Sequence, residues 1–214
     1  MSALQLTLVR HGETEWTEAG RLHGRLDSPL SVAGRRHAEQ AAQALQGRPF
    51  DALYSSPRGR ALETAELLGA AVGLRVRPLD GLAEVDFGLL EGRPLHSVDP
   101  AGRGSWLHRL LMGLTIALTG EPSRRVAQRV QQALDQIVEA HRSQRVLVVT
   151  HWGVMSMIAA LTLDGAARRW RDHGPWAACG ISELEAEPAG GDGRVRWRAL
   201  RLNDTGHLDK ETPP

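Results

Sequence analysis

Apolar and polar residues alternate with two different periods along this chain of 214 residues. Residues 4–9 and 145–150 form short runs that become continuously apolar, a pattern typical of strands buried inside a parallel sheet. In three longer segments between these runs, apolar residues recur at helical spacing. This spacing predicts helices that begin near Ser31, Pro57 and Ser123.

Weaker patterns complete the predicted sheet. Residues 51–55 and 75–79 resemble short strands, and residues 181–187 and 194–202 flank a glycine-rich loop typical of a hairpin. Strands that alternate with helices predict an α/β fold. We expect a three-layer sandwich: a mainly parallel central sheet with helices on both faces, an antiparallel edge and a small inserted cap segment.

Length and composition favour one globular domain over residues 1–214. Residues 93–120 interrupt the alternation of strands and helices, and we expect them to form an insertion that covers the substrate. The chain is 42% hydrophobic and 24% charged, enough to fill a core. Its net charge of +1 gives no basic field that would attract nucleic acid or a membrane surface. The longest apolar run is too short for a membrane span, which needs about 20 residues. With no signal-peptide pattern, a cytoplasmic protein is expected.

Two histidines follow the strongest predicted strands at equivalent places. His11 comes directly after the first apolar run, beside Arg10, and His151 comes directly after the second. Ligands of open parallel sheets bind outside the carboxyl ends of the strands, so the two imidazoles are expected to face each other across one crevice. One histidine at a strand end is more often structural, but the repeated placement favours a functional role.

Further charged residues are expected at the same edge of the sheet. Arg58 and Arg60 stand at the start of the second predicted helix, whose free N–H groups attract anions. Together with a histidine they would suit a phosphate, although spacing alone favours a solvated pair of charges. Glu84 and Asp86 follow residues 75–79, and composition leaves open which is a general acid and whether either only caps a turn.

Metal and redox chemistry find little support in the sequence. Cys179 is the single cysteine, so it forms no internal disulfide and no thiolate zinc site by itself, and we interpret it as a small buried apolar residue. No cluster of carboxylates or cysteines accompanies His11 and His151. We therefore expect no metal and no cofactor.

The motifs also occur in the order of one known family. Arg10-His11-Gly12-Glu13-Thr14 resembles the signature of the histidine phosphatase superfamily, also called phosphoglycerate mutase-like, and the resemblance favours its phosphatase branch. It covers nearly the whole chain, which makes it far more specific than one Arg-His-Gly triplet. The other similar positions are residues 20–31, 34, 54–56, 60–65, 84, 86–88, 91–92, 120–121, 129, 150–153, 202–205 and 207–208.

This resemblance implies a metal-independent phosphomonoesterase. His11 would be the nucleophile and would carry the phosphoryl group as a phosphohistidine. Arg10, Arg60 and His151 would hold the phosphoryl oxygens. Glu84 would protonate the leaving oxygen and then deprotonate the attacking water. The implied partner is a small-molecule phosphate ester, with no nucleic acid and no membrane, and a homodimer is left open.

Two expected phosphate-site residues depart from the family pattern. Thr17 stands where many members have asparagine as a further phosphate contact, and its hydroxyl can still donate, with a shorter reach. Trp152 stands where a small residue is common after the second histidine, and its indole would narrow the pocket or supply a stacking wall. Both departures bear on substrate range.

Two other functions stay open. A cofactor-dependent phosphoglycerate mutase resembles the same core, but mutases of this family carry a longer segment after the acidic motif than the one between Gly92 and Gly120 here. A non-catalytic phospho-ligand binding or regulatory module would keep the phosphate-holding groups. The presence of both His11 and Glu84 favours an enzyme, because a binding module needs neither a nucleophile nor an acid.

Overall fold

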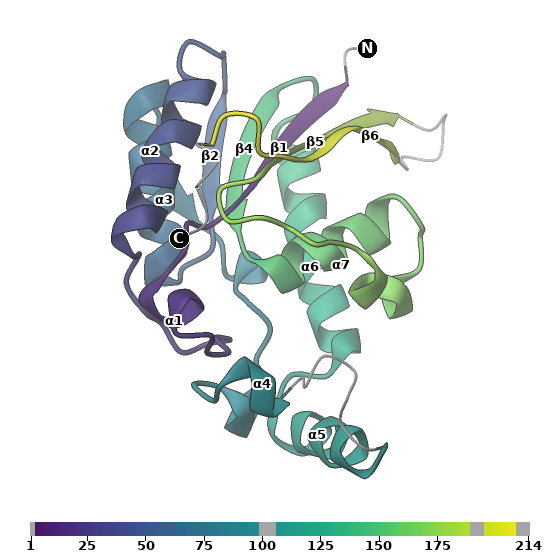
Figure 1. Cartoon of the computed structure of the whole chain (residues 1–214). Helices are drawn as coiled ribbons and strands as arrows, with labels where there is room; N and C mark the ends of the chain where they lie inside the picture. Colours follow the sequence, from purple (N-terminus) through teal and green to yellow (C-terminus); the bar gives the residue numbers. More distant parts are fainter. Residues whose placement is uncertain (1–2, 99–105, 189–194, 209–214) are drawn as a thin grey trace.

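A single mixed sheet forms the centre of the computed structural model, which describes residues 3–98, 106–188 and 195–208 (Figure 1). Within these residues the sheet has six strands in the order β3-β2-β4-β1-β5-β6. The pairs among the first four strands are parallel, and β5 and β6 add an antiparallel edge. The strands are β1 (Leu4–Arg10), β2 (Ala52–Ser55), β3 (Val76–Pro78), β4 (Arg145–Thr150), β5 (Ile181–Pro188) and β6 (Val195–Asp204).

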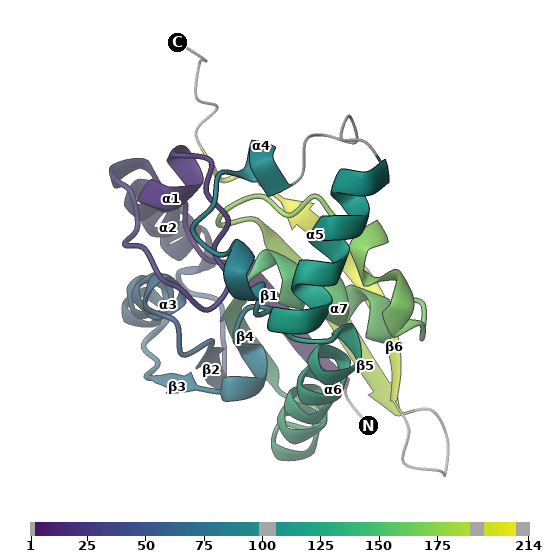
Figure 2. The ribbon, with the colours of Figure 1, turned by 90° about the horizontal axis from the view of Figure 1, so that it is seen from below.

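Helices cover both faces of this sheet, as Figures 1 and 2 show. Val146 and Val148 of β4 pack in one cluster with the apolar faces of α6 and α7, whereas Leu147 and Val149 pack in a second cluster with α2 and α3. A strand with a packed layer on each side must be apolar at every position, which explains its continuous apolar run. The four helices are α2 (Val32–Leu45), α3 (Gly59–Val72), α6 (Ser123–Ala140) and α7 (Trp152–Thr162). The predicted α/β sandwich is confirmed.

The ends of the helices follow from local chemistry, with one correction. Ser31 caps α2 as predicted, because its hydroxyl accepts the N–H of Gly34 at 3.0 Å. The prediction that a helix starts at Pro57 is wrong by two residues, since α3 begins at Gly59. The carboxylate of Asp27, from a distant loop, accepts the first N–H groups of α3, and this long-range cap fixes where the helix starts.

The inserted segment adds two helices beyond the carboxyl ends of the parallel strands. These are α4 (Leu95–Val98) and α5 (Trp106–Thr119), seen in front of the sheet in Figure 2. α5 packs against the short helix η2 (Gly88–Leu90). That this segment covers a substrate stays a prediction, and the predicted glycine-rich loop at 189–193 and loose end at 210–214 lie outside the described residues.

Three short elements complete the described structure: α1 (Glu15–Glu18), η1 (Asp80–Leu82) and η3 (Ala167–Asp172). None of the helices in the described ranges is both long and apolar enough to cross a membrane. Of these elements, α1 and η1 position the site, because α1 follows the end of β1 and η1 leads from β3 to Glu84.

The close approach of α2 to the loop after β1 depends on Gly34. A Cβ at this position would lie 1.9 Å from the carbonyl oxygen of Glu13, two residues after His11. We expect Gly34→Ala to lower the free energy of unfolding by about 1–3 kcal/mol, because backbone atoms must move apart. Urea unfolding followed by circular dichroism measures this change.

Gly113→Ala is the matched control, because a Cβ on this residue of α5 meets no atom within 4 Å. It is expected to leave stability unchanged or raise it by up to about 1 kcal/mol, the difference in helix propensity. Equal effects of the two substitutions would contradict the close-approach argument.

Candidate active site

His11 and His151 emerge side by side from the centre of the sheet. β1 and β4 are parallel neighbours with Arg10 opposite Thr150, so the residue that follows each strand leaves at the same end. The two imidazole centroids are 5.0 Å apart, and both rings are buried. The two histidines thus lie side by side, as the strand-end argument predicted, and that they line one substrate crevice stays a prediction.

The hydrogen bonds of His11 assign its tautomer. Its Nδ1 lies 2.7 Å from the carbonyl oxygen of Gly12, which can only accept, so Nδ1 carries the proton and donates it. Nε2 therefore carries a lone pair and no proton. Nε of Arg60 donates to this nitrogen at 3.3 Å. An imidazole held by its own backbone, with Nε2 unprotonated, is arranged as a nucleophile.

Arg60 is almost completely buried, with 1% of its surface exposed, and four acceptors fix its guanidinium. Besides His11, it donates to the carbonyl oxygens of Leu26 and Gly24, each at 3.0 Å, and to the Asp27 carboxylate at 2.9 Å. Burial raises the pKa of Asp27, but the Arg60 guanidinium and two backbone N–H groups outweigh it and lower the pKa overall. The four acceptors therefore hold the guanidinium in one orientation.

Arg10 and His151 each have a side-chain nitrogen without a hydrogen-bond partner among the described residues. Nη1 of Arg10 donates to the carbonyl oxygen of Trp176 at 2.6 Å, and Nε2 of His151 lies 2.7 Å from the Ser56 hydroxyl. Within the described residues, Nε of Arg10 and Nδ1 of His151 are buried and have no hydrogen-bond partner. Such atoms are rare in folded proteins. Both residues adjoin His11, Arg10 in the chain and His151 at 5.0 Å between ring centroids, so the two unpaired nitrogens indicate a site for a bound polar group.

Burial and the arginines keep both imidazoles neutral. Burial lowers the pKa of His11 well below its usual range, and Arg10 and Arg60 lower it further. Burial also lowers the pKa of His151, with Arg60 the next cause. Nε2 of His11 thus keeps its lone pair at neutral pH.

Glu84 is a buried carboxyl group in the loop that follows η1. Its carboxylate accepts the N–H of Val85 at 2.9 Å and the N–H of Gly153 at 3.4 Å. Burial raises the pKa of Glu84, although these N–H groups and the nearby Arg60 and Arg10 act in the opposite direction. A Cβ at residue 153 would lie 2.6 Å from Oε1 of Glu84, so glycine is needed for this approach.

The sequence left open whether Glu84 or Asp86 is the general acid, and the contacts of the two carboxylates differ. Asp86 caps a turn by accepting the N–H of Gly88 at 2.7 Å and pairs with Arg25 at 3.3 Å. Glu84 instead is buried and interacts electrostatically with Arg60. The position of Glu84 favours it as the general acid.

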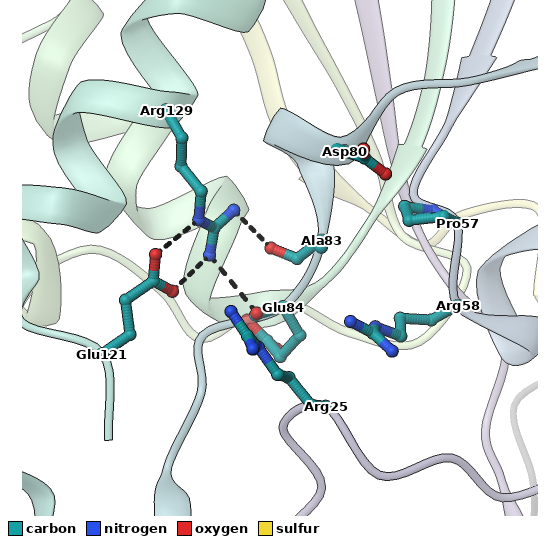
Figure 3. Close-up of a pocket in the computed structure, with 8 residues that line it drawn as sticks. All are labelled: Arg25, Pro57, Arg58, Asp80, Ala83, Glu84, Glu121 and Arg129. Atoms are coloured by element: carbon teal, nitrogen blue, oxygen red, sulfur yellow. Dashed lines mark hydrogen bonds and ion pairs between the residues drawn. The ribbon is translucent and has the colours of Figure 1, made fainter. Parts of the chain in front are cut away.

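Arg129 of α6 holds the loop that carries Glu84. Its guanidinium donates to the carbonyl oxygens of Gly81, Ala83 and Glu84 at 2.9, 2.6 and 3.3 Å. Glu121 binds the same guanidinium with both oxygens, at 2.8 and 2.9 Å (Figure 3). This ion pair gives a structural role to residues 121 and 129, two positions of the family resemblance to which the sequence assigned no role.

The two unusual phosphate-site candidates lie at different places. The hydroxyl of Thr17 is 3.0 Å from that of Thr14 in the N-terminal turn of α1. The ring of Trp152 packs edge-on against Trp170, with centroids 6.1 Å apart, and belongs to the margin of the core around α7. A phosphate contact of either residue stays a prediction.

The sequence did not single out two residues that lie near His11 and His151 as candidate site residues. His23 lies 6.3 Å from His11 between ring centroids, and its Nε2 contacts the Thr14 hydroxyl at 2.8 Å. Burial, followed by Arg60, lowers its pKa to about 4. Ser56, the partner of His151, comes directly after β2, so the strand-end argument used for the histidines also applies to it.

A cavity of about 340 Å³ opens beside Glu84 (Figure 3). Its lining comes from four separated parts of the chain and includes three arginines and three carboxylates. Within the described ranges, no group of three or more histidine, cysteine or acidic residues is arranged to hold a metal ion. The described site thus offers cationic and hydrogen-bonding groups to a ligand.

Residues 6–205 match the family model of the histidine phosphatase superfamily (branch 1), so the chain belongs to this family. The chain is 32% identical to a probable phosphoglycerate mutase GpmB of Yersinia pestis, over 96% of this chain and 95% of that protein. Among solved structures, it resembles a mycobacterial glucosyl-3-phosphoglycerate phosphatase at 26% identity and a TM-score of 0.79, covering 95% and 100% of the two chains. Bacillus stearothermophilus YhfR is 28% identical with a TM-score of 0.81, covering 97% and 100%.

The lowered pKa values give a test that needs no substrate. We expect the imidazole resonances of His11 and His151 to stay those of neutral rings between pH 8 and about 5.5, because both pKa values lie well below 6.5. Two-dimensional NMR of the imidazole nitrogens measures this. The urea-unfolded chain is the control, since its histidines titrate near pH 6.5.

The same shifts affect stability. The unfolded chain binds these protons near pH 6.5 and the folded chain does not, so stability is full above pH 6.5 and falls as the pH is lowered below it. A stability that is constant between pH 7 and pH 5, or protonation of His11 in the folded protein near pH 6.5, would contradict the burial argument.

Proposed function

We propose that the chain is a metal-independent phosphomonoesterase that works through a phosphohistidine at Nε2 of His11. One observation carries this proposal: Nε2 faces Arg60, and the buried Arg10 Nε and His151 Nδ1 have no partner among the described residues. A phosphoryl group on Nε2 supplies acceptors for Nε–H of Arg10 and for Nδ1 of His151 in the tautomer that carries its proton on Nδ1. The likeness to a glucosyl-3-phosphoglycerate phosphatase supports a hydrolase.

In the first step, Nε2 of His11 attacks the phosphorus, and the bond from phosphorus to the ester oxygen breaks. Arg10, Arg60 and His151 stabilise the charge on the phosphoryl oxygens. Glu84 enters protonated, as its raised pKa favours, and gives its proton to the leaving oxygen. The products are an alcohol and phosphorylated His11.

In the second step, water attacks the phosphohistidine. Glu84, now ionised, removes a proton from the water, and the bond from phosphorus to Nε2 breaks. Inorganic phosphate leaves, Nε2 regains its lone pair, and Glu84 is protonated again. The hydrogen bond from Nδ1 to Gly12 holds the ring through both steps.

A mutase is the second candidate, supported by the relatives named probable phosphoglycerate mutase. Their match covers 95% of their length, so the short segment after residue 92 does not set this chain apart from them. In a mutase the phosphoryl group passes from His11 to a hydroxyl of the bound ligand instead of to water. The fate of the labelled phosphoryl group, inorganic phosphate or a new ester, distinguishes the two.

The covalent step predicts a label on His11. Denaturing quench during turnover of a radiolabelled phosphate ester, in the presence of a chelator, is expected to yield acid-labile and base-stable label in the peptide that contains His11. His11→Ala should abolish both label and turnover, because no other nucleophile lies at this position. Label on the His151 peptide, or loss of labelling on chelation, would contradict the proposal.

The role of Glu84 predicts a dependence on the leaving group. An alkoxide needs a proton as it departs, whereas a nitrophenolate is stable without one. Glu84→Gln should therefore slow phosphorylation of His11 by alkyl phosphates by about 10²–10⁴-fold and slow the nitrophenyl phosphate burst much less. Rapid-quench burst kinetics isolate this step from hydrolysis of the intermediate.

Asp86→Asn is the matched control, since Asp86 caps a turn two residues away. It should leave the ratio between the alkyl and nitrophenyl rates unchanged. A change of that ratio in Asp86→Asn but not in Glu84→Gln would assign the acid to Asp86.

A further inference from the structure

Arg10 and Arg60 are held in different ways. Arg60 donates to four acceptors, which fix its guanidinium. Nη1 of Arg10 donates to the carbonyl oxygen of Trp176 at 2.6 Å, and its Nε has no partner within the described part of the chain. The orientation of the Arg10 guanidinium therefore depends on the position of the Trp176 carbonyl group.

The Trp176 carbonyl group is part of a peptide unit that Asn203 holds from its other side. Oδ1 of Asn203 accepts the N–H of Ala177 at 2.7 Å. This N–H and the carbonyl group of Trp176 belong to one planar trans peptide and point in opposite directions. Asn203 and Arg10 thus bind the two edges of one rigid unit, and a rotation that weakens one hydrogen bond also weakens the other.

The side chain of Trp176 does not fix this peptide by itself. Its indole is buried, and Nε1 donates to the Ser156 hydroxyl of α7 at 2.9 Å. This contact anchors the side chain, but the peptide plane that follows can still turn about the single bonds on either side of it. The hydrogen bond to Asn203 removes that freedom. Because hydrogen bonds in a chain polarise one another, it also strengthens the carbonyl oxygen as an acceptor for Arg10.

The end of β6 presents the amide of Asn203 to this peptide. Asn203 has a φ of 49°, in the left-handed region that asparagine tolerates better than most residues. Its own N–H donates to the Ser182 hydroxyl of β5 at 2.9 Å, which fixes its backbone. A Cβ on Gly180 would lie 2.6 Å from Oδ1 of Asn203, so the close approach needs glycine there. Residues of the antiparallel edge of the sheet therefore hold the amide in place.

The same C-terminal segment also holds the turn that follows the peptide. Nε2 of His207 donates to the carbonyl oxygen of Cys179 at 3.1 Å, and the N–H of Cys179 donates to the carbonyl oxygen of Arg10 at 3.0 Å. Asn203 and His207 both belong to the positions of the family resemblance for which the sequence indicated no role. Their contacts converge on the segment that binds Arg10 through its side chain and through its backbone.

We propose that Asn203 is a positioning residue: it holds the peptide between Trp176 and Ala177 and thereby fixes the orientation in which Arg10 binds the phosphoryl oxygens. This inference rests on the proposed function, which assigns Arg10 to those oxygens. Asn203 acts through Arg10, and no contact of Asn203 with the substrate is part of the proposal.

The orientation of Arg10 can be measured without a substrate. In nitrogen NMR, a guanidinium whose rotation about its C–N bonds is slowed by a strong hydrogen bond gives separate Nη signals, and a freely rotating one gives an averaged signal. The wild-type protein should show separate Nη signals for Arg10, assigned by their loss in Arg10→Lys. Asn203→Gly keeps the left-handed backbone and removes the acceptor, so it should average these signals.

The same substitution should slow the reaction. We expect Asn203→Gly to lower kcat/KM for an alkyl phosphate about 10- to 100-fold, because displacement of a group that holds the phosphoryl group is costly even when the change lies elsewhere. Asn203→Asp retains an acceptor oxygen of the same reach and should restore the separate Nη signals and most of the rate. Asn203→Ser, whose hydroxyl has a shorter reach, should behave as Asn203→Gly does.

Ser143→Gly is the matched control, because Ser143 is an exposed residue with a φ of 62° in the turn before β4. It also replaces a left-handed residue by glycine, and it should leave the Arg10 signals and kcat/KM as in the wild-type protein. Three results would overturn the inference: averaged Arg10 signals in the wild-type protein, unchanged signals in Asn203→Gly, or an equal loss of rate in Asn203→Gly and Asn203→Asp.

The outcome is separable from that of the proposed function. If a labelled ester leaves no phosphohistidine on the wild-type protein and releases no phosphate, the phosphomonoesterase proposal fails, and the NMR comparison still decides whether Asn203 orients Arg10. If His11 is labelled and the Arg10 signals do not depend on Asn203, the phosphomonoesterase stands and the positioning inference fails. Thermal unfolding of each variant checks that a change in signals or rate does not come from loss of the folded state.

Discussion

Arg60 lies almost entirely out of water, and a buried guanidinium costs several kcal/mol unless its donors find acceptors. Asp27, two carbonyl oxygens and His11 accept from it, and the same Asp27 accepts the first N–H groups of α3. One carboxylate thus sets the start of the helix, the orientation of the guanidinium and its charge balance. Because Nε of Arg60 reaches Nε2 of His11, the loop before α2 is joined to the end of β1. His11 and Arg60 therefore cannot move independently.

The low polarity of this interior acts in opposite directions on the imidazoles and on the carboxyl group. Burial disfavours the charged form of each group, so it lowers the pKa of His11 and His151 and raises that of Glu84. The nearby arginines lower all three pKa values. They therefore add to the lowering of the histidine pKa values and limit the rise in the pKa of Glu84. The acid-base chemistry proposed here needs a neutral nucleophile and a protonated acid at the same pH. A single physical cause, exclusion of water, favours both states.

The sequence predicted what depends on local pattern and on the general geometry of parallel sheets. The apolar runs at 4–9 and 145–150 were sufficient to place both histidines at one end of the sheet. Contacts between distant segments were not predictable in this way. The cap of α3 by Asp27 and the support of the Glu84 loop by Arg129 join residues 33 and 46 positions apart in the chain. The choice between Glu84 and Asp86 required burial, which a spacing of two residues does not reveal.

The proposed phosphohistidine is compatible with two chemical outcomes, because hydrolysis and mutase transfer would both begin with it. The groups around the phosphoryl oxygens stabilise the same charge in both, so His11, Arg10, Arg60 and His151 do not separate them. What differs is the acceptor in the second step, and it must approach from the side of Glu84, where the alcohol has left. An alcohol that stays next to the intermediate can take the phosphoryl group back on one of its hydroxyls, whereas an alcohol that leaves gives its place to water. In the proposed mechanism, the time that the alcohol spends beside the phosphohistidine therefore sets the balance between mutase and phosphatase chemistry.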